Sequence, residues 1–319
     1  MNGTVLPLFL GGLTIFVFSI SQLSGVLESF FSEKTRHYIY RYTRNSWMSA
    51  LVGILVTILM GSSSAVIILT IILINAKALN FKQSIGIILG ANLGTTFTSQ
   101  LIALDISNYA FIPLIVGLMI QLFLKKKPYS SYGKILFYFG MLFFGLFIME
   151  ESVMPLRESD LFETWVAKIE GNPFQGAWVG GLITLLIQSS SATVGIAILL
   201  GKQGLINAAG GVSLMLGAEL GTCSDTLLAT IKGSRAAIRA GVFHLIFNLI
   251  SISLGLLLFD QFLELVIYVS RNSNLDQIIA NGHILFNSLG VLLFFPFIGF
   301  FEKLLVKLIP DKQLIEKAP

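Results

Sequence analysis

Charged residues and cysteine are both scarce in this sequence. Only 12% of its 319 residues are Asp, Glu, Lys or Arg, whereas a soluble domain usually carries about 25%. This scarcity excludes an ordinary soluble domain. The single cysteine, Cys223, excludes a framework of intrachain disulfides. No group of residues has the spacing of a zinc site.

Apolar residues take the place of the missing charges. They make up 55% of the chain, and the mean hydropathy is +0.83. Each helical crossing of a membrane needs about 20 largely apolar residues. The sequence therefore predicts an all-α polytopic membrane protein. Its predicted full spans are 6–27, 81–104, 109–124, 133–153, 205–231, 241–259 and 281–301.

Two further apolar segments, 47–76 and 174–202, are each interrupted by three consecutive serines. The interruption leaves arms of about 14 residues, which reach only about 20 Å as helix. A bilayer core is roughly 30 Å thick. The two segments are therefore predicted to form re-entrant helical hairpins rather than pairs of spans.

The basic residues lie mostly in short segments between the predicted spans. Most of the 21 Lys and Arg residues fall in 33–45, 77–82, 125–134, 232–239 and the tail from residue 302. With the two hairpins re-entrant, all of these segments lie on one side of the membrane. The positive-inside rule then places the N-terminus outside and the C-terminus in the cytoplasm, at the plasma membrane. The basic residues behind the net charge of +4 thus mark the cytoplasmic side of the membrane, and no nucleic-acid partner is expected.

The chain also contains an internal repeat. Residues 53–98 align without a gap with 180–225, at an offset of 127 residues. Three full spans separate the two copies, so the second copy enters the membrane from the opposite face. This is an inverted-topology repeat, as in many secondary transporters.

The repeat divides the chain into two parts. The first, 1–132, holds a leading helix, the hairpin at 47–76 and the spans 81–104 and 109–124. The second, 133–319, holds a leading helix, the hairpin at 174–202, the spans 205–231, 241–259 and 281–301, and a short cytoplasmic tail.

The repeated motifs carry chemistry suited to ions. A serine triplet at a helix break offers hydroxyls and free backbone N–H groups at the positive end of a helix dipole, which favours an anion. The glycine-flanked motifs GANLGT and GAELGT offer oxygens, which favour a small cation. The predicted substrate-binding residues are Ser62, Ser63, Ser64, Gln188, Ser189, Ser190 and Ser191. The predicted cation-binding residues are Asn92, Thr95, Thr96, Glu219, Thr222 and Asp225.

His244 and His283 occur in the matching pentapeptides HLIFN and HILFN. Each His therefore shares a helix face with the Asn four residues later. Interhelical hydrogen bonding and proton relay both remain open for the two histidines. Glu219 and Asp225 lie within a predicted span, where a carboxylate is costly. They are expected to bind a cation or a proton, and the alternative is a purely structural role.

Four segments together resemble the sodium/phosphate cotransporter family, in its short bacterial members. They are LIQSSSATVGIAILL, ILGANLGTT, GSRAAIRAGVFHLIFN and the final HILFN. The resemblance implies sodium-coupled transport of inorganic phosphate, with both ions held between the serine hairpins and no PhoU-like domain. Sodium is the coupling ion, and no other cofactor is expected. Two positions depart from the family pattern, since Gly61 replaces a Gln and Glu219 replaces an Asn.

Other functions are compatible with the sequence. The substrate could be another small anion or solute, and the chain could be a non-transporting regulatory component of the membrane. An intramembrane serine hydrolase has no use for a duplicated serine triplet, and no GxSG-like elbow is present. The protein is therefore not expected to be an enzyme, and no catalytic residue is predicted.

Overall fold

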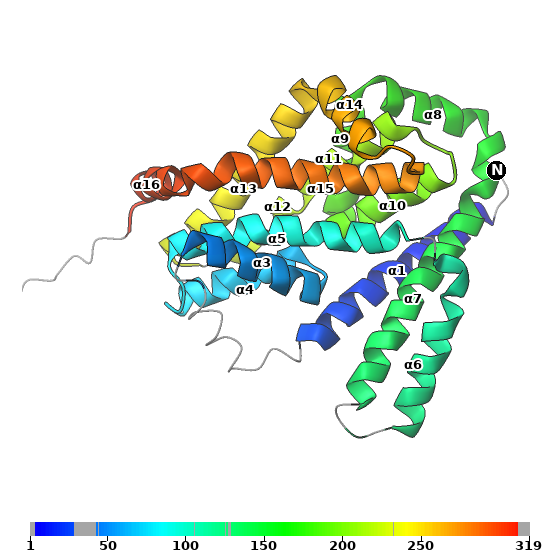
Figure 1. Ribbon diagram of the computed structural model, residues 1–319, viewed down its shortest axis with the longest axis horizontal. Coiled ribbons are helices and arrows are strands. Elements are labelled where there is room, and N and C mark those ends of the chain that lie inside the picture. The colour runs from blue at the N-terminus through cyan, green and yellow to red at the C-terminus, as the bar shows by residue number, and fades with distance from the viewer. Residues whose placement is uncertain are drawn as a thin grey trace, which may run out of the picture.

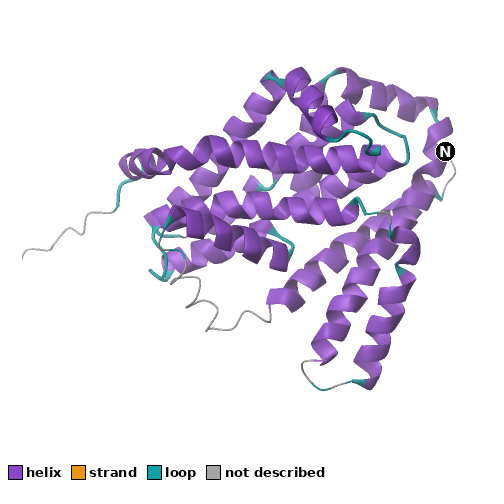
Figure 2. Ribbon diagram, viewed as in Figure 1, coloured by secondary structure: helices purple, strands orange, loops and turns teal. Residues whose placement is uncertain are grey.

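The computed structural model describes residues 4–28, 43, 45–104, 106–124, 126, 129–231 and 233–311. Within these ranges all regular structure is helical (Figure 2). Five helical segments are long and apolar enough to cross a membrane. They are 5–23, 81–102, 129–156, 235–257 and 275–308. The prediction of an all-helical chain with several apolar helices is confirmed.

The first half of the chain forms α1 (Val5–Glu28), α3 (Ser46–Met60), α4 (Ser63–Asn75), α5 (Phe81–Ile102), α6 (Phe111–Phe123) and α7 (Tyr129–Val153). The second half forms α8 (Asp160–Gly171), α9 (Pro173–Ile187), α10 (Ser190–Lys202), α11 (Ala208–Gly221), α12 (Cys223–Thr230), α13 (Arg235–Leu257), α14 (Phe259–Val269), α15 (Leu275–Phe294) and α16 (Ile298–Leu308). Short 3-10 turns occupy Ser107–Tyr109, Met154–Glu158 and Phe295–Phe297.

Helices far apart in sequence pack together in the centre of the molecule. α5 contacts α15, α13 and α10, while α11 contacts α13 and α15 (Figure 1). The arm formed by α1, α6 and α7 extends to one side of this group, with α6 and α1 packed on α7. The buried core consists of two hydrophobic clusters, and each contains residues from both halves of the chain.

Each serine triplet lies where one short helix ends and the next begins, as predicted. α3 and α9 have 15 residues each, and α4 and α10 have 13 each. Gly61 ends α3 in the left-handed region at φ +65°, and Gln188 ends α9 there at φ +58°. Ser62 and Ser189 then cap α4 and α10 by accepting a backbone N–H three residues ahead. The break in each segment is thus a left-handed C-cap followed directly by a serine N-cap.

The repeat extends to helix packing. A Cβ at Gly90 would lie 1.9 Å from the Ala50 carbonyl oxygen, and a Cβ at Gly217 would lie 1.8 Å from that of Ala177. Both the glycines and their partners are separated by the repeat offset. The backbones of α3 and α5 therefore touch at the position that is equivalent to the contact between the backbones of α9 and α11.

We expect Gly217→Ala to destabilise the protein, because the added methyl group would overlap backbone that cannot move independently of its helix. Overpacking of this kind typically costs about 1–3 kcal/mol. The measurement is the melting temperature of the purified protein in detergent. Gly11→Ala is the matched control, because nothing lies within 4 Å of a Cβ at Gly11. Equal melting temperatures for the two variants would contradict the close packing.

At one level of this interface the two copies have exchanged residues. Gly86 on α5 faces Ser49 on α3, whereas Ser213 on α11 faces Gly176 on α9. The four positions correspond at the repeat offset. Each interface thus pairs one glycine with one serine, on opposite helices in the two copies.

Two predicted spans differ from the structure, and a third, 281–301, lies within the candidate span 275–308 but is not one continuous α-helix. The segment 205–231 is two helices, because the chain breaks at Thr222 between α11 and α12. The segment 281–301 covers the end of α15, a 3-10 turn containing Pro296, and the start of α16. Proline lacks the N–H that a continuous helix needs, so the helix ends there. The segment 109–124 contains only the 13-residue α6.

Candidate functional site

The serines of both triplets surround helix N-termini. Ser62 and Ser189 use their side chains as caps, at 3.3 Å and 3.2 Å from the backbone nitrogens they bind. Ser63, Ser190 and Ser191 are buried in the first turns of α4 and α10. A helix N-terminus carries a partial positive charge of about half a unit. Each triplet therefore combines hydroxyl groups with the positive end of a helix.

The first triplet and the residue before the second triplet both approach the first turn of α12. The Ser64 side chain lies near the Asp225 carboxylate, and α4 packs against α12. The Gln188 side-chain amide lies 3.5 Å from Ser224 Oγ, and its Nε2 also donates to the Leu185 carbonyl oxygen at 2.5 Å. Ser224 and Asp225 are adjacent residues. The ends of two helix pairs from different repeats thus meet at one point, beside the N-terminus of a third helix.

The predicted cation-binding residues divide into two groups. Asp225 lies with the serine triplets, and its own carboxylate accepts the Thr226 N–H at 2.7 Å. The others are buried in α5, in α11 and at the break before α12. These buried residues are Asn92, Thr95, Thr96, Glu219 and Thr222. The three threonine hydroxyls donate to carbonyls of their own helix turn.

Glu219 is bonded to a histidine from another helix. Its Oε1 lies 2.8 Å from His283 Nε2 on α15, and His283 Nδ1 lies 2.6 Å from Ser99 Oγ on α5. Ser99, His283 and Glu219 are all at most 2% exposed. The order hydroxyl, imidazole, carboxylate matches that of a hydrolase, but no substrate reaches a hydroxyl this deeply buried. The arrangement ties three helices together.

His244, in the other pentapeptide of the pattern HxxFN, also bonds to a hydroxyl on another helix. His244 Nδ1 lies 2.9 Å from Thr226 Oγ1 on α12. Thr226 and Ser99 correspond at the repeat offset. Both histidines therefore make interhelical hydrogen bonds to matching positions of the two repeats.

Several polar residues of this core were not among the predicted site residues. Ser99, Ser224 and Thr226 are single hydroxyl residues in helical sequence and carry no motif of their own. Asn248 and Asn287 belong to the HxxFN pentapeptides. Their side chains are buried, and Asn248 Nδ2 contacts Cys223 Sγ and His244 Nε2. The pentapeptide was visible in the sequence, but its partners across the helix interface were not.

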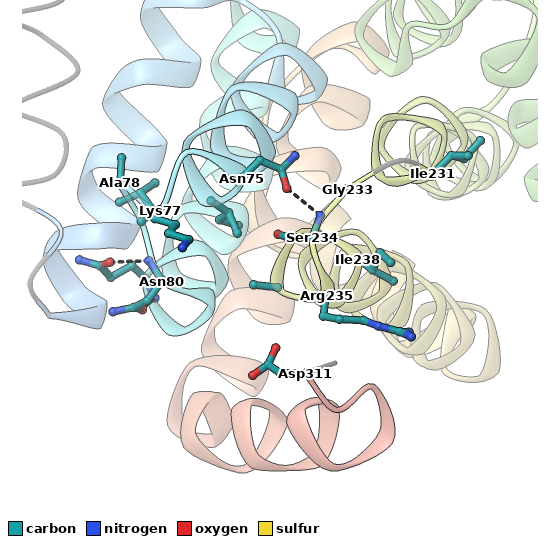
Figure 3. A pocket seen from close by; sticks show the side chains of 14 residues that line it. Asn75, Lys77, Ala78, Asn80, Ile231, Gly233, Ser234, Arg235, Ile238 and Asp311 are labelled. Atoms are coloured by element: carbon teal, nitrogen blue, oxygen red, sulfur yellow. Dashed lines mark hydrogen bonds between the residues drawn. The ribbon is translucent and has the colours of Figure 1, made fainter. Parts of the chain in front are cut away.

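A cavity of about 950 Å³ lies at the other end of α4, away from the serines (Figure 3). It is lined by the turn between α4 and α5 and by the start of α13. Asn75 Oδ1 accepts the Ser234 N–H there at 2.8 Å. The basic lining residues that the structure describes are Lys77 and Arg235, and none of the predicted site residues lines the cavity. α4 is thus hydrogen-bonded to the second repeat at this end and packs against α12 of the same repeat.

Comparison with known proteins agrees with the duplication. A sequence model of the Na+/Pi-cotransporter family matches residues 15–151 and again residues 152–292. The uncharacterized protein YqeW of Bacillus subtilis is 28% identical over 308 residues, covering 97% of this chain and 99% of YqeW. No solved structure gives a significant match.

Two relatives have names that state a function. The putative inorganic phosphate export protein YjbB of Escherichia coli is 22% identical over 92% of this chain, which spans 53% of YjbB. The human sodium-dependent phosphate transport protein 2B is 31% identical over 101 residues, or 31% of this chain and 15% of that protein. The two family matches together cover most of the sequence, and the chain therefore belongs to the Na+/Pi-cotransporter family.

Proposed function

We propose that the protein is a sodium-coupled secondary transporter of inorganic phosphate in the plasma membrane. Phosphate binds between the two serine triplets, and the two helix pairs act as re-entrant hairpins of an inverted repeat. The observation that carries this proposal is that Ser64 of the first triplet and Gln188, next to the second triplet, both lie near the first turn of α12. Three helix N-termini lie there, and their N–H groups and hydroxyls suit a phosphate ion.

Sodium follows from the charge balance at this point. α3, α4, α9 and α12 contain no Lys or Arg, so no basic side chain of these helices neutralises a bound anion. Asp225 adds a negative charge of its own. A cation bound with the phosphate offsets both, since unpaired charges are costly at low dielectric. Asp225 and the threonines of the glycine-flanked motifs are the proposed sodium ligands.

The family membership supports the proposal further. YjbB is named a phosphate export protein and the human relative a sodium-dependent phosphate transporter. Placing the basic segments inside gives an external N-terminus and a cytoplasmic C-terminus. The cavity beside Lys77 and Arg235 then opens on the cytoplasmic side.

The test is transport of labelled phosphate by the purified protein in liposomes. We expect flux that requires sodium on the side from which phosphate is taken, and that stops when choline replaces sodium at fixed pH. Equal flux in choline would rule out sodium coupling, and flux of another anion with none of phosphate would reassign the substrate.

Gln188→Gly tests the site in the same assay. The substitution removes the side-chain amide and suits the left-handed backbone, as Gly61 does at the matching position. Losing one hydrogen bond to a charged group costs about 1.5–3 kcal/mol, a roughly tenfold to hundredfold loss of phosphate affinity. Gln261→Ala, an exposed position on α14, is the control. Unchanged phosphate affinity in Gln188→Gly would remove Gln188 from the site.

A further inference from the structure

Two buried polar clusters with matching composition lie in the central core. In one, His283 on α15 bonds to Ser99 on α5 at 2.6 Å. In the other, His244 on α13 bonds to Thr226 on α12 at 2.9 Å. Because Ser99 and Thr226 correspond in the repeat, the two clusters are equivalent parts of the two copies.

One helix turn further along, each cluster contains an asparagine. In the second copy Asn248 Nδ2 lies 3.2 Å from Cys223 Sγ. In the first copy α5 and α15 run antiparallel, since Gln100 bonds to Asn281 near one end and Lys82 pairs with Glu302 near the other. The turn after His283 therefore brings Asn287 to the level of Thr96.

Thr96 and Cys223 are the same position of the repeat. The first copy thus places a hydroxyl where the second places a thiol. Thr96 is 5% exposed and Cys223 is 2% exposed, so neither side chain is open to bulk water.

Each asparagine has a carbonyl oxygen without a partner. Asn248 Oδ1 and Asn287 Oδ1 are buried and accept no hydrogen bond from any described residue. An unpaired buried carbonyl is unfavourable, and such exceptions call for a ligand or a role. A small hard cation binds amide and hydroxyl oxygens well, whereas sulfur suits softer metals. The cluster with Thr96 offers two oxygens, and the cluster with Cys223 offers one.

We propose that Asn287 Oδ1 and Thr96 Oγ1 bind one sodium ion, and that Cys223 weakens the equivalent position beside Asn248. The two copies then differ in cation binding although each histidine Nδ1 bonds to the hydroxyl at the matching position. This inference rests on the proposed sodium coupling. It adds Asn287 to the proposed sodium ligands. It also attributes the absence of an equivalent site in the second copy to one residue, Cys223.

The experiment measures sodium binding without transport, as the rise in melting temperature of the purified full chain when sodium replaces choline at constant ionic strength. A ligand that binds only the folded state stabilises it by RT ln(1 + [L]/Kd), so the rise in melting temperature with sodium concentration reports the dissociation constant. Asn287→Leu and Thr96→Cys should each raise the apparent dissociation constant for sodium about tenfold or more. Asn248→Leu, the matched control, should leave it within about twofold of wild type.

A conservative variant and a gain-of-function variant complete the design. Asn287→Asp keeps the oxygen ligands and should retain sodium binding even if Asn287→Leu folds poorly. Cys223→Thr should add a second, steeper sodium-dependent component to the stabilisation.

The outcomes separate the two proposals. Suppose that sodium stabilises the wild type. If Asn248→Leu then lowers the apparent sodium affinity as much as Asn287→Leu does, or if Thr96→Cys leaves that affinity unchanged, the assignment to Asn287 and Thr96 is wrong while sodium coupling stands. If sodium does not stabilise the wild type at all, the proposed coupling itself fails.

Discussion

Asp225→Asn is expected to reduce sodium-coupled phosphate transport at least about a hundredfold, equivalent to roughly 2.7 kcal/mol. Asparagine has nearly the same shape as aspartate, so its oxygen can still face Ser64 and the local packing of α4 on α12 should be preserved. What is lost is the negative charge. Among the described residues, no hydrogen bond joins another carboxylate to the serine triplets. The proposed sodium ion would therefore lose its one charged ligand at that point.

The measurement is the sodium dependence of labelled phosphate flux in liposomes, at several sodium concentrations. We expect the apparent affinity for sodium to fall with the flux. Asp260→Asn is the control, because Asp260 is exposed in the first turn of α14 and far from the serines. If Asp225→Asn transports like wild type with unchanged sodium dependence, Asp225 is not a sodium ligand.

Glu219→Leu is expected to lower the free energy of unfolding by about 3–5 kcal/mol, because removing one partner of a buried polar pair strands the other. His283 Nε2 would lose its bond at 2.8 Å, and no described residue is positioned to replace Glu219. The carboxylate links α11 to α15, and His283 extends the link to α5 through Ser99. The loss should appear as a large drop in melting temperature in detergent.

Glu219→Gln is the matched variant for this pair. Its amide oxygen can still accept from His283, so most of the stability should remain. The same variant tests whether Glu219 also binds sodium, since its apparent sodium affinity should fall if it does. A Leu variant as stable as the wild type would show that the buried pair does not hold the three helices together.

The helix breaks at the serine triplets were predictable because their causes are local. A serine followed by a helical run is an N-cap, and a short apolar arm cannot span a bilayer. The aligned glycines, including Gly90 and Gly217, were interpreted as parts of a cation-binding motif, and their role in close helix packing was not predicted. The break at Thr222 was not predicted either, since no proline or capping side chain marks it. There the interruption depends on how α12 packs against α13 and α4.

The residues of the proposed site were selected from the sequence for a similar reason. The serines belong to repeated motifs, and Asp225 follows the second glycine-flanked motif, where the first copy has Thr98. The contact of Glu219 with His283 spans 64 residues of sequence and depends on the register between two helices. A sequence without an aligned set of relatives does not fix such a register. Asn248 and Asn287 were missed because their importance lies in the neighbours that this register gives them.

The exchange of glycine and serine between the copies means that the two repeats are no longer interchangeable parts. Moving the α5 sequence into the place of α11 would set Gly86 against Gly176 and leave a gap between the helices. The reverse transfer would set Ser213 against Ser49, where one side chain already fills the space. Each interface has kept its fit through paired changes, so each copy now recognises only its own partner helix. A chain assembled from two identical copies of either repeat would keep both interfaces, whereas a chain with the helices shuffled would keep neither.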